Sequence, residues 1–228
     1  MPDSGFWDQA VRFLNITLID IALSGDNAIV IGMAAATLPR GRRTPAILIG
    51  GALAILLRIG LTSIATLLML VPYLSSAGGI VLFWVVYRLL KPEKEGRKET
   101  GLKEAKGFKQ AIFLIVAADF MMSLDNVIAV AGSAHGSIFL LVAGLLISMP
   151  LLMTAGGLIS RLIDKARWLV YIGAAAISFT ASRMIFEDKA IEARVHAGRG
   201  VALLVSTAAA LIVPALILLF RRRGGKKE

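Results

Sequence analysis

The sequence predicts an all-α polytopic membrane protein with seven transmembrane helices. Hydrophobic residues make up 57% of its 228 residues. Several charge-free runs reach the roughly 20 residues that a helix needs to cross a bilayer. Basic residues gather in alternate segments between these runs, as the positive-inside rule describes. These observations indicate that the lipid bilayer surrounds most of the chain.

The first half of the chain accounts for three spans. Residues 7–36 form the first. The next charge-free run, residues 59–87, is longer than one crossing requires, and Pro72 and the pair Gly78-Gly79 interrupt it. We therefore predict spans over residues 45–70 and 74–90, joined by a tight turn near residues 71–76.

The second half of the chain accounts for four more spans. The predicted spans cover residues 108–132, 137–160, 168–186 and 201–220, of which 137–160 and 201–220 contain no charge. Lys and Glu alternate through residues 91–107, which is typical of a solvated linker. The expected organisation is a first repeat over 1–90, this linker, a second repeat over 108–190, and a last span with a basic tail over 191–228.

The net charge of +10 does not indicate nucleic-acid binding, because the basic residues alternate with the spans rather than forming one surface. Most of the 25 Lys and Arg fall after the first, third and fifth spans and in the tail. The N-terminus is therefore expected outside and the C-terminus in the cytoplasm. The start of the chain lacks the basic region of a cleaved signal peptide, so the first span is expected to be retained.

A short phrase occurs twice at lipid depth. Its four polar positions are Asp20, Ser24, Asp26 and Asn27 in the first span and Asp119, Ser123, Asp125 and Asn126 in the fourth. The predicted topology gives these two spans opposite directions, so spans 1–3 and 4–6 form a 3+3 inverted repeat with one further C-terminal helix. Inverted repeats that bring polar helices together at the midplane are typical of secondary transporters. Coincidence is the alternative, and the identical spacing argues against it.

The four aspartates need compensation. An ionised Asp at the centre of a span costs about 3 kcal/mol even on lenient insertion scales. Arg58 in the second span is the obvious counter-charge, and Arg183 near the end of the sixth is a weaker one. Two arginines cannot neutralise four carboxylates, which favours a bound cation or protons over purely structural pairing.

The spacing predicts how these side chains diverge. On a continuous helix Asp20, Ser24 and Asn27 share one stripe, whereas Asp26 points about 120° away. Either the helix unwinds near Ser24-Gly25-Asp26 or there are two subsites. Leu124 stands where the first copy has Gly25, so the two halves need not break alike.

The available ligands are mainly hard oxygens, which suit Mg²⁺, Ca²⁺ or Mn²⁺. There is no cysteine, which excludes disulfides and thiolate sites, and the two histidines, His135 and His196, fall in predicted outer loops. A thioether such as that of Met122 would favour Mn²⁺, although methionine more often fills gaps in a core.

The doubled phrase, Asp-x-x-x-Ser-x-Asp-Asn at residues 20–27 and 119–126, resembles that of the TerC integral membrane proteins, particularly their shorter bacterial branch. The resemblance extends over nearly all seven predicted spans. It implies a manganese exporter of the bacterial cytoplasmic membrane, within a wider superfamily of cation and amino-acid exporters. Carried over by position, the functional residues are Asp20, Asp26, Asp119 and Asp125, with Asn27 and Asn126 as partners.

The resulting hypothesis is a divalent-cation transporter with no prosthetic group and no catalytic residue. Mn²⁺ would bind Asp26, Asn27, Asp125 and Asn126, with Asp20 and Asp119 as further ligands or a proton route. Auxiliary roles fall to Ser24, Ser123, Met122 and Arg58. Protons are the expected coupling ion. The direction of transport rests on the resemblance alone, and the sequence leaves the oligomeric state open.

Three alternatives stay open. The chain could be an integral scaffold or partner without transport of its own. It could export an amino acid or another small solute, although Arg58 is the one evident anchor for a substrate carboxylate. An intramembrane aspartyl protease would need one Asp on each of two helices sharing a proton, which fits two Asp-Asn sets poorly.

Overall fold

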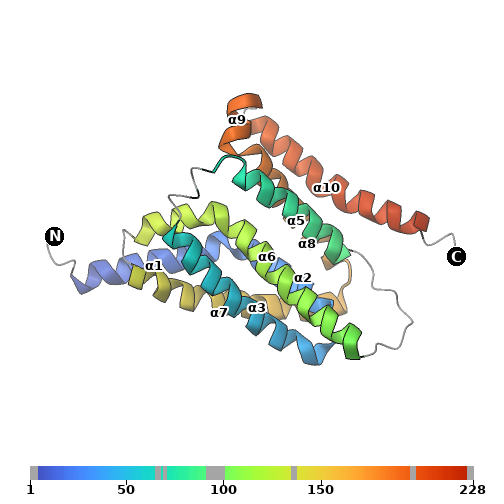
Figure 1. Ribbon diagram of the computed structural model, residues 1–228, viewed down its shortest axis with the longest axis horizontal. Coiled ribbons are helices and arrows are strands. Elements are labelled where there is room, and N and C mark those ends of the chain that lie inside the picture. Colours follow the sequence, from blue (N-terminus) through green and yellow to red (C-terminus); the bar gives the residue numbers. More distant parts are fainter. Residues whose placement is uncertain are drawn as a thin grey trace.

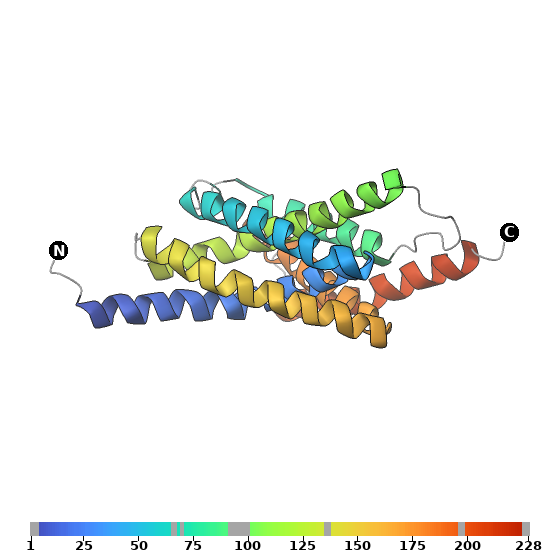
Figure 2. The same ribbon diagram turned by 90° about the horizontal axis from the view of Figure 1, so that it is seen from below.

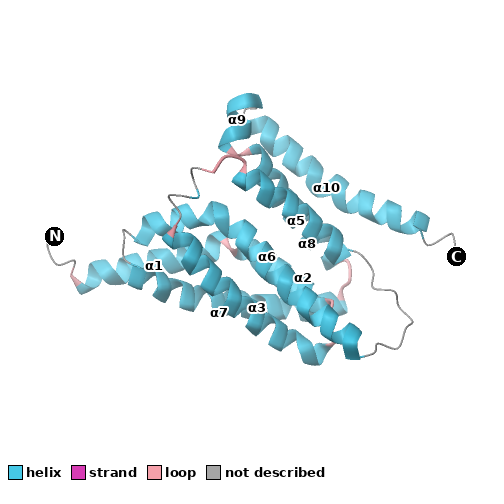
Figure 3. Cartoon of the chain, viewed as in Figure 1, coloured by secondary structure: helices cyan, strands magenta, loops and turns pink. Residues whose placement is uncertain are grey.

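The computed structural model is all-helical over the residues it describes, which are 5–64, 68, 71–90, 101–134, 138–195 and 199–224 (Figure 3). Within these ranges the side chains at 6–8, 101–106, 125–134, 138, 141, 193–195, 199, 218 and 220–224 are not described. The helices are α1 (Phe6–Leu23), α2 (Gly25–Ala36), α3 (Arg40–Ser63), α5 (Leu74–Leu90), α6 (Gly101–Ala134), α7 (Ile138–Lys165), α8 (Leu169–Phe186), α9 (Lys189–Val195) and α10 (Arg199–Gly224).

The predicted fold class is confirmed at the level of an all-α membrane protein. Five of the described helices are long and apolar enough to cross a bilayer, and α1 and α2 together make a sixth candidate span, bent by 53°. Helix α5 is apolar but has only 17 residues. The count of seven spans and the orientation of the termini stay predictions.

Several helices begin or end outside the predicted spans. Helix α3 begins at Arg40 and carries Pro45 inside it, α6 begins at Gly101 within the predicted linker, and α7 continues to Lys165. The short helix α9 was not predicted. Arg, Lys and Glu are good helix formers, so a span readily continues as helix into water. Hydropathy locates the apolar part of a helix and not its ends.

Helix α6 occupies the middle of the bundle, where it contacts α1, α2, α3 and α5. Helix α7 packs along α1, α2 and α3, whereas α8 packs between α5 and α10 (Figure 1). The view from below shows α1 beside α7, with α1 starting near one end of the long axis and α10 ending near the other (Figure 2). The aspartate-bearing helices are thus enclosed by their neighbours.

The surface of the bundle is apolar as well as its core. The largest hydrophobic cluster joins α2, α5, α6 and α8, with Ile31, Leu82, Ile115 and Ile177 among its buried side chains. On the outside, Phe139 is 79% exposed and Leu204 is 72% exposed. Large apolar side chains over so much of the outer face suit contact with lipid chains and not with water.

Close packing of α2 on α7 depends on glycine, which gives a first prediction. A Cβ on Gly32 would lie 2.5 Å from Ile159 Cγ2 and 2.9 Å from the carbonyl oxygen of Gly156. We expect Gly32→Ala to destabilise the protein by about 1–3 kcal/mol, because overpacking must move these neighbours.

The matched control for this prediction is Gly60→Ala in α3. A Cβ on Gly60 would meet nothing within 4 Å, and alanine favours helix more than glycine does. Thermal unfolding of the two purified variants in the same detergent measures the difference. Equal melting temperatures would show that α2 and α7 are not packed as described.

Candidate functional site

The first aspartate phrase lies at a break in the helix. Helix α1 ends at Leu23 and α2 begins at Gly25, with Ser24 between them at φ −106° and ψ 11°. The Ser24 N–H still donates to the Asp20 carbonyl at 2.9 Å, and the Asn27 N–H donates to the Ser24 carbonyl at 3.1 Å. Helix α6 continues through the corresponding Ser123 and Leu124. The sequence left open whether the two halves break alike, and in the structure the first copy interrupts its helix whereas the second does not.

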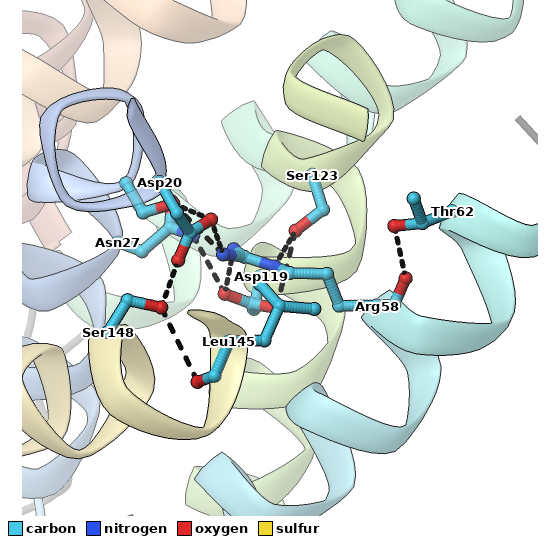
Figure 4. A network of polar contacts seen from close by, with 9 residues as sticks. Asp20, Asn27, Arg58, Thr62, Asp119, Ser123, Leu145 and Ser148 are labelled. Carbon is cyan, nitrogen blue, oxygen red and sulfur yellow. Dashed lines mark hydrogen bonds and ion pairs between the residues drawn. The ribbon is translucent and has the colours of Figure 1, made fainter. Parts of the chain in front are cut away.

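Arg58 joins the two copies of the phrase (Figure 4). Its Nη1 donates to Asp20 Oδ1 at 2.6 Å, and its Nη2 donates to Asp119 Oδ1 at 2.8 Å. The exposed fractions of Asp20, Arg58 and Asp119 are 0%, 2% and 2%. The predicted role of Arg58 as a counter-charge is therefore confirmed. Arg58 bridges two helices through equivalent aspartates that are 99 positions apart in the sequence.

Two serines complete the hydrogen bonding around the guanidinium. Ser24 Oγ accepts from Arg58 Nη1 at 3.0 Å and donates to Asp20 Oδ1 at 3.3 Å. Ser123 Oγ accepts from Arg58 Nε at 2.9 Å and donates to Asp119 Oδ2 at 3.4 Å. Each serine thus lies between Arg58 and the aspartate four residues before it, so the two copies present the same arrangement to one arginine.

Two further contacts close the network. Asn27 Nδ2 donates to Asp119 Oδ1 at 2.7 Å, and Ser148 Oγ on α7 donates to Asp20 Oδ2 at 2.5 Å (Figure 4). Asp20 and Ser24 both bond Arg58, and Asn27 joins the same network through Asp119, so the three side chains predicted to share one stripe lie together. The sequence gave no reason to select Ser148, because a lone hydroxyl in an apolar span usually bonds its own helix.

Asp26 lies outside this network, as its position off the stripe predicted. Its Oδ2 accepts a hydrogen bond from Thr180 Oγ1 on α8 at 3.2 Å. Its Oδ1 is buried without a hydrogen-bond partner among the described residues, and so is the Oδ1 of Asn27. The first turn of α2 therefore carries two adjacent residues that each have a free oxygen acceptor. Thr180 also went unnoticed in the sequence, where it is one more hydroxyl in an apolar span.

Part of the predicted site falls outside the described side chains. Asp125 and Asn126 lie on the α6 backbone, but their side chains are not described, and His135 and His196 lie outside the described residues. Among the side chains that are described, no three acidic, histidine or cysteine groups gather as a metal site would require.

Two other residues singled out in the sequence, Arg183 and Met122, lie outside the aspartate network. Arg183 pairs with Glu187 at 2.7 Å on the exposed end of α8, so the prediction that it is an intramembrane counter-charge is wrong. The i,i+4 spacing gives it a carboxylate on its own helix. Met122 is buried in the main hydrophobic cluster, where its surroundings support a packing role.

The charges in the described site do not balance. Asp20 and Asp119 share a single arginine, and Asp26 forms no ion pair with any described residue. With all groups ionised, these four side chains carry two uncompensated negative charges. Burying a carboxylate without compensation is costly. The arrangement is therefore suited to a divalent cation or to protons.

Comparison with known proteins places the chain among membrane proteins. Residues 6–225 match the family described as the integral membrane protein TerC family. An uncharacterized membrane protein of Bacillus subtilis strain 168, YjbE, is 42% identical over 182 residues, which cover 80% of this chain and 82% of the relative. The UPF0053 inner membrane protein YgdQ of Escherichia coli K12 is 30% identical over 167 residues, 66% of this chain and 69% of the relative. No solved structure matches.

Proposed function

This chain belongs to the TerC family of integral membrane proteins, and we propose that it is a divalent-cation transporter that exports Mn²⁺ across the bacterial cytoplasmic membrane. The observation that carries the proposal is the group of buried carboxylates that Arg58 neutralises only in part. A cation of charge +2 would balance the two negative charges that remain after Arg58 neutralises one of the three carboxylates of Asp20, Asp26 and Asp119.

The packing of the helices supports two inverted halves. In two equivalent halves, α1 and α2 would correspond to α6, and α3 would correspond to α7. The contact between α2 and α7 would then have the contact between α6 and α3 as its counterpart. Both contacts are present and extensive. The exchange likewise maps the contact between α5 and α8 onto itself. Alternating access would then come from the two halves moving about the aspartates, with α10 as a peripheral brace against α8.

Two subsites account for the separation of the aspartates. In the proposed arrangement Asp26 and Asn27 offer their free oxygens to the metal, together with Asp125 and Asn126. Asp20 and Asp119 form the second subsite at Arg58 and provide the proton route, because protons can replace the charge of the departing cation beside buried carboxylates. Oxygen ligands suit Mn²⁺ as well as Ca²⁺ and Mg²⁺, so selectivity needs a direct test.

The geometry gives less support to an organic substrate. Arg58 is the residue that would anchor a substrate carboxylate, and it is already bonded to two aspartates and two serines. Hydrogen bonds to described residues thus occupy four of its five N–H donors. The scaffold alternative is separated from transport by the flux measurement below.

We expect the purified protein in liposomes to carry Mn²⁺ in preference to Ca²⁺, Mg²⁺ and Zn²⁺. The double variant Asp26→Asn/Asp125→Asn should lower the Mn²⁺ flux roughly tenfold or more, because a lost ionic contact in a buried site is worth about 2 kcal/mol. A metal-sensitive dye inside the liposomes gives the flux, and an imposed pH gradient in the same assay tests proton coupling.

The control is Arg183→Gln, which changes a charge on α8 that is paired at the surface. Its flux should stay near that of the unaltered protein. Absence of flux for every ion from well-folded protein would favour the scaffold reading. Transport that persists in the double variant would remove Asp26 and Asp125 from the site.

A further inference from the structure

A cavity lies between α3 and α7, away from the aspartate network. Its volume is about 440 Å³, and it is bounded by the first two turns of α3 and the last two turns of α7. Four residues of α3 line it at helical spacing, and five residues of α7 line the other side: Arg40, Arg43, Thr44 and Ile47; Gly157, Ser160, Arg161, Asp164 and Lys165. Both helices reach this end of the bundle side by side in Figure 1.

The lining carries four cationic side chains and one carboxylate. Arg43 is held in place, because it donates to both oxygens of Asp164 at 2.8 and 2.9 Å and to the carbonyl of Ser160 at 3.2 Å. Arg40 also donates to Asp164, at 3.0 Å. Arg161 and Lys165 form no ion pair within the described part of the chain. Asp164 therefore leaves most of the positive charge in the cavity uncompensated.

One hydroxyl at this cavity is buried without a hydrogen-bond partner among the described residues. Ser160 is 1% exposed, and its Oγ forms no hydrogen bond with any described residue. Most buried polar atoms in proteins do have a partner, so this hydroxyl has a donor left over beside the basic lining.

Gly157 keeps the cavity open. A Cβ at this position would meet only Ile47 Cδ1, at 3.9 Å, whereas a Cβ on the adjacent Gly156 would lie 2.5 Å from Ile31 Cγ2. Gly156 thus serves the packing of α7 on α2, and Gly157 leaves space that a ligand can use.

We propose that this cavity binds a phosphate group. Guanidinium and ammonium groups together with hydroxyls are the donors that phosphate oxygens accept. Basic pockets between transmembrane helices at the cytoplasmic side are suited to lipid headgroups. The exposed Leu158 and Leu162 on the same part of α7 would lie beside the acyl chains of such a lipid. The phosphate comes either from an anionic phospholipid or from solution, and the chemistry of recognition is the same.

The test compares three probes on purified protein in detergent: phosphatidylglycerol, phosphatidylcholine and inorganic phosphate. We expect phosphatidylglycerol to raise the melting temperature more than phosphatidylcholine does. Arg161→Gln/Lys165→Gln should weaken phosphatidylglycerol binding roughly tenfold or more, because each substitution removes a charge contact between a basic side chain and the anionic headgroup. Gly157→Leu should also weaken it, with every charge retained.

The matched control is Lys109→Gln, because Lys109 is an exposed lysine of α6 that does not line the cavity. It should bind phosphatidylglycerol as the unaltered protein does. Competition by inorganic phosphate would assign the site to a dissolved anion, and no competition would assign it to the lipid. The proposal is overturned if the double variant and Gly157→Leu, both folded by circular dichroism, bind phosphatidylglycerol as tightly as the control.

Discussion

Arg58→Ala should prevent the protein from accumulating in a folded form, and not merely slow transport. The substitution leaves Asp20 and Asp119 buried with no cation, and removing one partner of a buried ion pair costs about 3–5 kcal/mol. That is a large part of the stability of an ordinary folded domain. The yield of membrane-inserted protein and its melting temperature should both fall.

Arg183→Ala is the matched control, since it removes the same side chain from an exposed pair with Glu187. An exposed pair contributes less than about 1 kcal/mol, so its yield should be normal. The triple variant Arg58→Ala/Asp20→Asn/Asp119→Asn should recover most of the loss, because no charge remains at the three positions of the ion-paired network. A normal yield of Arg58→Ala with altered flux would contradict the role of a fixed counter-ion and favour a mobile one.

Much of the aspartate network was predictable because it depends on helical geometry. The i, i+4, i+7 spacing of Asp20, Ser24 and Asn27 requires a shared stripe wherever the chain is helical, and Arg58 was the clearest intramembrane cation. The structure brings these residues together and keeps Asp26 apart, although the helix is broken at Ser24 and the stripe does not run along one continuous helix.

The remaining contacts depend on tertiary packing. Ser148 and Thr180 are single hydroxyls on apolar helices, and only the placement of α7 beside α1 and of α8 beside α2 brings them to Asp20 and Asp26. The basic cavity was equally hidden, since Arg40 and Arg161 are ordinary members of basic loops in the sequence. For Arg183 the prediction overlooked Glu187, which stands four residues later and is therefore a neighbour on the same helix.

The aspartates of the Arg58 network should respond to neutralisation in a non-additive way. Asp20→Asn alone leaves Asp119 and Arg58 as a balanced pair, and Asp119→Asn alone leaves Asp20 and Arg58. Each single variant should therefore fold at least as well as the unaltered protein. The double variant leaves Arg58 buried without a carboxylate, so it should lose about 3–5 kcal/mol, well beyond the sum of the single effects.

Transport should follow a different order from stability. Each single variant removes one of the two negative charges that Arg58 does not neutralise, so we expect Mn²⁺ flux to fall roughly tenfold or more in both, although their melting temperatures are unchanged or raised. Melting temperatures and liposome flux on the same preparations separate the two effects. If both single variants transport Mn²⁺ at the unaltered rate, the Arg58 network serves only to hold the helices together. The cation path must then pass through Asp26 without involving Asp20 or Asp119.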